Sequence, residues 1–121
     1  MEAGALEDAL AAPALKRFAD LTVEVGAPVE VGAVELEHVA RLELDGGDRI
    51  YVKNDAVRTA PPEVMARLVR GEPVDPAAVY FRCVPGFETA SASLRWIMER
   101  VFVGNGVRRP SDVVMRFFEV L

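Results

Sequence analysis

Apolar and polar residues alternate along the segment from Val34 to Leu44, which predicts a strand with one buried face. A second strand follows from Arg49 to Asn54, where β-branched and aromatic residues dominate. A three-residue loop of Asp45, Gly46 and Gly47 would join them as a hairpin, because it sets Glu43 opposite Arg49 and Leu42 opposite Ile50. In this register His38 and Asn54 are the polar residues on an otherwise apolar face.

Further strands are indicated over residues 18–33, with a break at Gly26 and Pro28, and over residues 77–90, with a bend at Pro85-Gly86. Residues 100–104 and 112–120 are also predicted strands, separated by a turn at 105–110. The last strand is apolar on both faces, which indicates a central position or a contact surface. Residues 91–100 could form a helical turn with Leu94, Ile97 and Met98 on one side.

One clear helix is predicted within residues 59–76, with Pro62 in its first turn and Gly71 as its stop signal. Residues 1–12 could form a second, short helix before Pro13, or a loosely ordered end. The pattern as a whole predicts an all-β protein with one or two short helices. A small antiparallel β-barrel is favoured, and a flat sheet with a helix on one face is the alternative.

Composition excludes several classes of function. The net charge of −5 argues against a general nucleic-acid binder. One cysteine and one histidine leave no intramolecular disulfide, no cysteine-based metal site and no multi-histidine centre within a chain. No apolar run reaches membrane-spanning length, and the acidic N-terminal residues do not resemble a secretory signal. We therefore expect a cytoplasmic protein without metal or cofactor.

Several runs occur in an order and spacing that resemble one family. They are DGGDRIYVKNDAVR, APPEVMARLVRGEPVDPAAVYFR, FETA and FVGNGVRRPSDVVMRFFEV. Over residues 19–121 the chain resembles the DUF3237 family, also called UPF0311, and residues 1–18 would be an extension. The resemblance implies a small antiparallel β-barrel with an internal pocket, and no established reaction.

The chain departs from the family pattern after its first strand, where a Gly- and Pro-rich segment that makes further barrel strands is missing. His38 and Val39 also differ from the small and basic residues expected there. Three arrangements could deal with the missing wall: a smaller barrel, an N-terminal helix over the gap, or a second subunit. We favour a homodimer, since unpaired strand edges are usually covered.

The resemblance repeats Tyr51, Asn54, Arg58, Arg82, Glu88 and Thr89. Arg58 could anchor a substrate carboxylate or fix its loop. Arg82 could bind the same acidic group, although a structural salt bridge with Glu88 is the simpler interpretation. Asn54 would orient the ligand or satisfy His38, and Tyr51 could donate a hydrogen bond or simply pack.

His38 or Glu88 would move a proton if the protein is an enzyme, with His38 titrating nearest neutrality. A hydrogen-bonded core histidine is the alternative. Three hypotheses follow: an enzyme of isomerase, cyclase or hydratase type acting on a small organic substrate, a carrier or sensor of a small hydrophobic ligand, or an assembly protein. Either small-molecule hypothesis predicts an inward face with His38, Asn54 and at least one of Arg58, Arg82 and Glu88 around a cavity.

Overall fold

The computed structural model describes residues 3–24, 35–43 and 48–121, and for residue 24 and residues 35–43 it describes the backbone only. The strands are β1 (Leu15–Glu24), β2 (Glu35–Glu43), β3 (Arg49–Thr59), β4 (Tyr80–Glu88), β5 (Phe102–Arg108) and β6 (Asp112–Val120). The helices are α1 (Ala3–Ala9), α2 (Pro62–Val69) and two 3-10 segments, η1 (Pro76–Ala78) and η2 (Ala92–Glu99).

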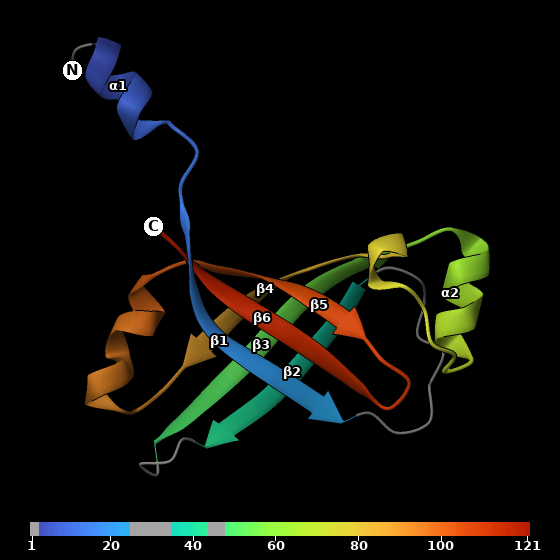
Figure 1. Cartoon of the computed structure of the whole chain (residues 1–121). Coiled ribbons are helices and arrows are strands. Elements are labelled where there is room, and N and C mark those ends of the chain that lie inside the picture. Colours follow the sequence, from blue (N-terminus) through green and yellow to red (C-terminus); the bar gives the residue numbers. More distant parts are fainter. Residues whose placement is uncertain (1–2, 25–34, 44–47) are drawn as a thin grey trace.

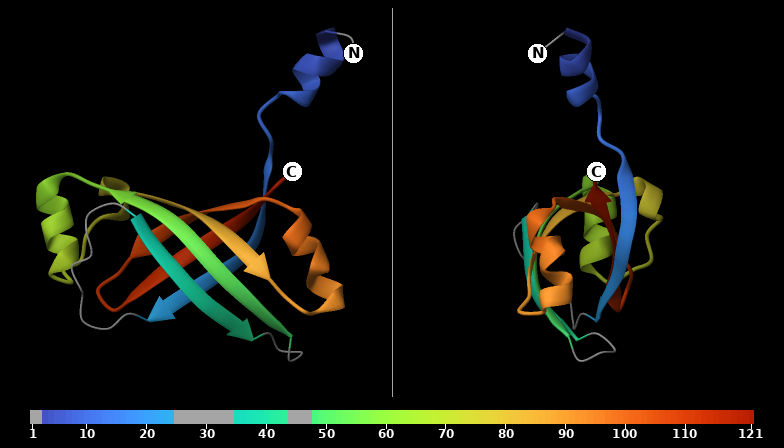
Figure 2. Two further views of the ribbon diagram at one scale, coloured as in Figure 1. Left: turned by 180° about the vertical axis from the view of Figure 1, so that it is seen from behind. Right: turned by 90° about the vertical axis from the view of Figure 1, so that its left-hand side faces the viewer.

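All six strands form one antiparallel sheet in the order β1-β6-β5-β4-β3-β2 (Figure 1). The sheet curls, so that β1 and β2 lie on opposite sides of the fold (Figure 2). The predicted mostly-β antiparallel architecture is confirmed. Within the described ranges, no backbone pairing joins β1 to β2, so the sheet is an open barrel with these two strands as its edges.

The predicted hairpin register is confirmed, because Glu43 lies opposite Arg49 and Leu42 opposite Ile50. The same register sets the backbone of His38 opposite that of Asn54. β3 continues to Thr59, beyond the predicted end at Asn54, and its side chains alternate between exposed and buried as far as Val57.

The inner face of the curled sheet holds the hydrophobic core. Phe87, Phe102 and Phe117 meet there in tilted and edge-to-face contacts, with ring centroids 4.9 to 5.8 Å apart. Aliphatic side chains from β3 and β6 complete this core, and Ile97 of η2 closes one end of it. β6 lies between β1 and β5, which confirms its predicted central position.

Helix α2 lies at the opposite end of the sheet from η2 (Figures 1 and 2). It buries Leu68 and ends at Val69, and the predicted stop signal, Gly71, follows the Arg70 cap with a φ of 75° that is available to glycine without steric cost. The amide of Gly71 donates to the carbonyl of Leu68, and that of Glu72 donates to the carbonyl of Arg67. These two bonds satisfy the last helical carbonyls, as in a Schellman motif.

Four local predictions were wrong. β4 continues without a break through Pro85-Gly86. Its pairing with β5 stops at Cys83, so the missing N–H of Pro85 interrupts no hydrogen bonds between β4 and β5. Asn105 to Arg108 belong to β5 and not to a turn. Met98 is exposed, while Ile97 is buried. β1 begins at Leu15, inside the segment predicted to be an extension.

Candidate functional site

Arg58 ends the inner face of β3, beside helix α2. Its cross-strand partner is Phe81, and the guanidinium carbon lies 5.9 Å from the centroid of that ring. The side chain is half-buried, and its Nε is fully buried with no hydrogen-bond partner among the described residues. A buried donor without an acceptor costs free energy, and within the described part of the chain the Nε of Arg58 is such a donor.

The guanidinium of Arg108, the last residue of β5, lies near that of Arg58. Burial lowers the pKa of Arg58 below its usual value, and the positive charge of Arg108 lowers it further. Arg108 itself donates to the backbone carbonyl of Asp112 at 3.3 Å, which holds it at the end of its strand. The two guanidiniums together concentrate positive charge at this end of the sheet, which an anion would compensate.

A small cavity lies next to this pair, between α2, η1 and β5. Leu68, Val79, Phe81, Gly106 and Arg108 are among its lining residues, and its volume is about 10 Å³. That volume has room for about one water molecule. An organic anion at the Arg58–Arg108 pair would therefore have to approach from the solvent side.

Asn54 faces inward, as predicted, and lies deep in the core. Its Nδ2 donates to the sulfur of Met115 at 2.9 Å, while its Oδ1 has no partner among the described residues. Cys83 lies nearby, and burial raises the pKa of its thiol, although the Asn54 side chain and the charge of Arg82 oppose the effect. Asn54 is thus packed among buried side chains of the described residues, and the predicted cavity around it, like its ligand role, stays a prediction.

Arg82, Glu88 and Tyr51 lie on the outer face, contrary to the expectation that Arg82 or Glu88 might share the interior with Asn54. All three are exposed, because each has the opposite parity to the buried residues of its strand. Arg82 stacks over the ring of Tyr80 at 4.9 Å and donates to the carbonyl of Phe81 at 2.9 Å.

The anticipated Arg82–Glu88 salt bridge is not among the ion pairs of the described residues. Since β4 is straight, six residues separate the two side chains by roughly 20 Å. Arg58 and Arg82 also lie on opposite faces of the sheet, so they cannot hold the same acidic group.

The side chain of His38 lies outside the described residues, so only its backbone position opposite Asn54 is known. Thr89 has a structural role: its hydroxyl donates to the carbonyl of Arg49 at 2.7 Å and accepts from the amide of Ser91 at 3.1 Å. These contacts tie the end of β4 to the start of β3.

Arg108 was not singled out from the sequence, because NGVRRP resembles a turn. The signal that could have found it is the alternation from Phe102 to Arg108. Phe102, Gly104 and Gly106 occupy the even, inner positions, and Arg108 follows at the same spacing. Both inner positions require glycine because a Cβ would collide with a neighbour. At Gly104 it would lie 2.7 Å from the carbonyl oxygen of Arg116, and at Gly106 it would lie 2.6 Å from the ring of Phe81.

The described residues contain no group of three or more histidine, cysteine or acidic side chains that could hold a metal ion. Nor does any of their helices have the length and apolar character needed to cross a bilayer.

Comparison with known proteins decides the family. A family model described as "Protein of unknown function (DUF3237)" matches residues 30–120, which is most of the chain. The chain belongs to the DUF3237 family. A UPF0311 protein of Rhodopseudomonas palustris is 42% identical to this DUF3237 member over 88 residues, covering 73% of this chain and 58% of the relative. One from Clostridium acetobutylicum is 39% identical over 89 residues, covering 74% and 56%.

This DUF3237 member therefore spans somewhat more than half the length of the curated relatives that it matches, consistent with the predicted shortened form. A crystal structure of the conserved protein of unknown function from R. palustris matches with a TM-score of 0.70 over 72% of this chain and 58% of that one. A β-barrel-like protein from Acinetobacter baumannii, 20% identical, matches with a TM-score of 0.63 over 89% and 96%. The latter likeness supports the barrel-like fold alone.

Proposed function

We propose that this protein binds a small organic anion, of the carboxylate or enolate class, at the end of the sheet where Arg58 meets Arg108. The observation that carries the proposal is the half-buried guanidinium of Arg58, which forms no ion pair among the described residues and feels the positive charge of Arg108. A carboxylate presents two oxygens in a plane and matches the planar donors of a guanidinium.

The surroundings of Arg58 support an anion and not a neutral ligand. Arg108 adds a second positive charge, and no carboxylate of the described residues forms an ion pair with Arg58. Phe81 packs beneath the guanidinium and excludes water from one side of it. Because this wall is apolar, an anion with a hydrophobic portion would gain contacts that inorganic phosphate lacks.

Acid–base turnover of the bound anion, of isomerase, cyclase or hydratase type, requires a titratable group close to it. Glu88 does not meet this requirement: it lies on the outer face, about seven strand residues or roughly 23 Å from the position of Arg58. His38 lies opposite Asn54, four residues before Arg58 along β3. The enzyme hypothesis therefore depends on His38, whereas carrier or sensor function requires the arginine pair alone.

Isothermal titration calorimetry with acetate, malonate, benzoate and inorganic phosphate tests the proposal. We expect a carboxylate to bind the wild-type protein, and Arg58→Gln to weaken its binding at least tenfold, since a charge-assisted bidentate contact is worth about 1.5–3 kcal/mol. Arg95→Gln is the matched control, because Arg95 is an exposed arginine of η2 at the other end of the sheet. Equal binding by the Arg58 and Arg95 variants, or no binding of any probe to the wild type, would refute the proposal.

A further inference from the structure

A groove crosses the outer face of the sheet where β4 and β5 part. These strands pair only at Arg82 with Asn105 and at Cys83 with Gly104, so the sheet opens on either side of that contact. The groove has a volume of about 1060 Å³. Its apolar walls are Leu15, Val57, Tyr80, Val84, Val103 and Phe118.

Four of these apolar wall residues, Leu15, Val57, Tyr80 and Val84, are exposed. Tyr80 is 55% exposed and Val84 is 54% exposed, and both point away from the core. Contiguous apolar surface of this kind on a soluble domain marks a site where another surface docks.

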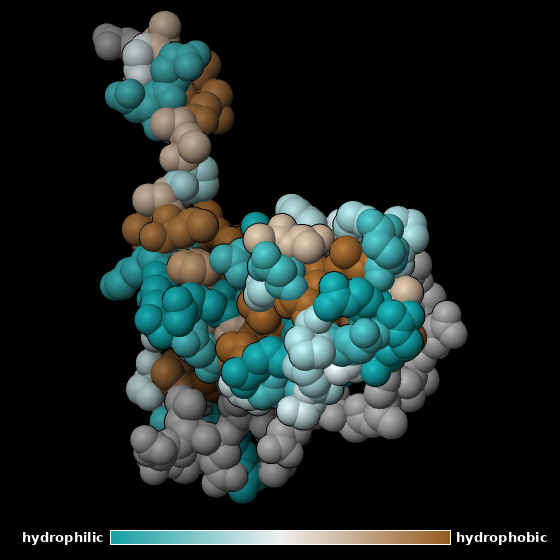
Figure 3. Space-filling model, turned by 45° about the vertical axis from the view of Figure 1, so that its right-hand side comes forward, coloured by the Kyte–Doolittle hydropathy of each residue, from teal (hydrophilic) through white to brown (hydrophobic). Residues whose placement is uncertain are grey.

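The same chain carries a second apolar surface without a partner, the arm formed by residues 3–14. Helix α1 buries no residue, and Leu6 and Leu10 are 46% and 71% exposed. They are four residues apart and lie along one side, and hydrophobic atoms gather on one flank of the helix (Figure 3). A seven-residue helix is too short to be stable alone in water, so it needs a surface to pack against.

The arm leaves the body of the protein beside the groove. Leu15, the first residue of β1, lines the groove, and the amide of Leu121 donates to the carbonyl of Ala14 at 2.9 Å, which fixes the exit point. From there the arm extends away from its own sheet (Figures 1 and 2). It is therefore presented to a second molecule.

We propose that two copies of this chain exchange their arms, each α1 docking in the outer groove of the other copy. A helix of seven residues is about 10 Å long and about 10 Å across, or on the order of 800 Å³, which matches the groove in scale. The arrangement is two-fold symmetric and closed, because each copy supplies one arm and one groove. Arg82 and Asp55 both line the groove, so their charges offset one another, and the docking rests on the apolar contacts that Leu6 and Leu10 would make with its walls.

Disulfide trapping tests the exchange directly. In a Cys83→Ala background, a tagged chain with Leu10→Cys is mixed with an untagged chain with Val84→Cys under mild oxidation. We expect a cross-linked dimer that contains both chains, and none when Val84→Cys is replaced by Tyr51→Cys, an exposed position outside the groove. A cross-link within a single Leu10→Cys/Val84→Cys chain and none in the mixture would show that the arm closes on its own groove, which overturns the proposal.

Analytical ultracentrifugation provides the second readout. The wild-type chain should sediment as a dimer, and Leu6→Lys/Leu10→Lys should weaken the dimer on the order of a hundredfold or more, because each arm loses two buried leucines. Both leucines are exposed within one chain, so the variant should keep the wild-type circular dichroism spectrum. A monomeric wild type, or a dimer unaffected by the substitutions, would contradict the exchange.

Discussion

Asn54 is the buried residue whose polar groups are least well satisfied. Its Oδ1 has no partner among the described residues, and its Nδ2 donates to the thioether of Met115, which is a weak acceptor. The sequence placed this residue on the inner face correctly, because strand parity fixes the face. It could not reveal the contact with Met115, which is 61 residues away and depends on how the sheet curls.

Replacing Asn54 by leucine should therefore leave the stability of the protein unchanged or raise it by about 1 kcal/mol, since an unsatisfied polar group is removed and the side chain keeps the same number and branching of heavy atoms. Urea unfolding of the variant and of the wild type measures this. Asn54→Ala is the control for lost volume and should destabilise the fold. A loss of about 2 kcal/mol or more in the leucine variant would mean that Oδ1 has a partner.

Arg58 shows the limit of sequence reasoning at the residue scale. Its place at a strand end could be predicted from the following APP, while its role, anchoring a substrate carboxylate or fixing the loop, stays a prediction. Its buried Nε and its proximity to Arg108 could not, because they depend on the packing of β3, β4 and β5 around Phe81.

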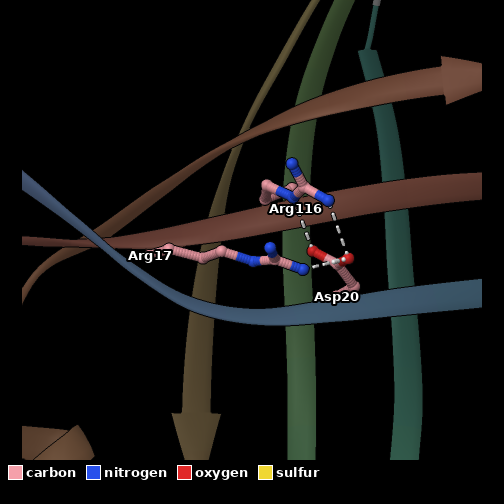
Figure 4. Close-up of polar contacts among 3 residues, drawn as sticks. All are labelled: Arg17, Asp20 and Arg116. Atoms are coloured by element: carbon pink, nitrogen blue, oxygen red, sulfur yellow. Dashed lines mark hydrogen bonds and ion pairs between the residues drawn. The ribbon is translucent and has the colours of Figure 1, made fainter.

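At the scale of elements, the paired strands β1 and β6 are linked on their outer face by Asp20, which lies between Arg17 and Arg116; we call this pairing the β1–β6 seam. Arg116 donates to both carboxylate oxygens of Asp20, at 2.8 and 3.0 Å, and Arg17 donates to Oδ2 at 2.8 Å (Figure 4). The hydrogen bonds from Arg116 are the main reason that the pKa of Asp20 is lowered below its usual value of 3.8.

This shift predicts how the seam responds to acid. Because the folded-state pKa is below the unfolded one, the carboxylate contributes stability above about pH 4 and loses that contribution as the pH falls through the folded value. The urea midpoint of the wild type should exceed that of Asp20→Asn at pH 7, and the two should converge near pH 2. The group is exposed, so 1 M NaCl should shrink the difference at pH 7. A difference that persists undiminished at pH 2 would contradict this account.

β5 packs closely on its inner face, where glycine leaves room for its neighbours. A Cβ at Gly104 would lie 2.7 Å from the backbone oxygen of Arg116, and backbone cannot move aside as a flexible side chain can. Gly104→Ala should destabilise the fold by about 1–3 kcal/mol. Gly86→Ala is the matched control within the same sheet, because its nearest contact is 3.7 Å, and it should cost well under 1 kcal/mol. Thermal unfolding compares the two variants. Equal melting temperatures would show that the inner face of β5 can accommodate a Cβ at position 104, which would contradict the prediction.

Element prediction succeeded where the local pattern and the fold agree. The β2–β3 register followed from period-two patterning on both strands, and the end of α2 followed from Gly71. It failed at Pro85-Gly86, where proline was taken to bend the strand. There β4 has a neighbour on one side only, a fact of topology that the local sequence does not contain.

At the scale of the whole molecule, the sheet is curled but open, with β1 and β2 as edges in the described part of the chain. Of the three arrangements considered for the missing wall, a covering N-terminal helix is the one at odds with the structure, because α1 extends into solvent. A second copy that docks its arm in the outer groove, as we propose, would join two chains but would not itself fill the space between β1 and β2.

The central claim concerns what the Arg58–Arg108 end of the sheet binds. The arginine Nε–H signals in a ¹⁵N-labelled sample, assigned through Arg58→Lys, report on that atom directly. During titration with benzoate or malonate, we predict that the Arg58 signal shifts progressively and saturates, while that of Arg95 does not move. A signal of Arg58 that stays fixed through the titration, or that shifts only in parallel with that of Arg95, would contradict the account.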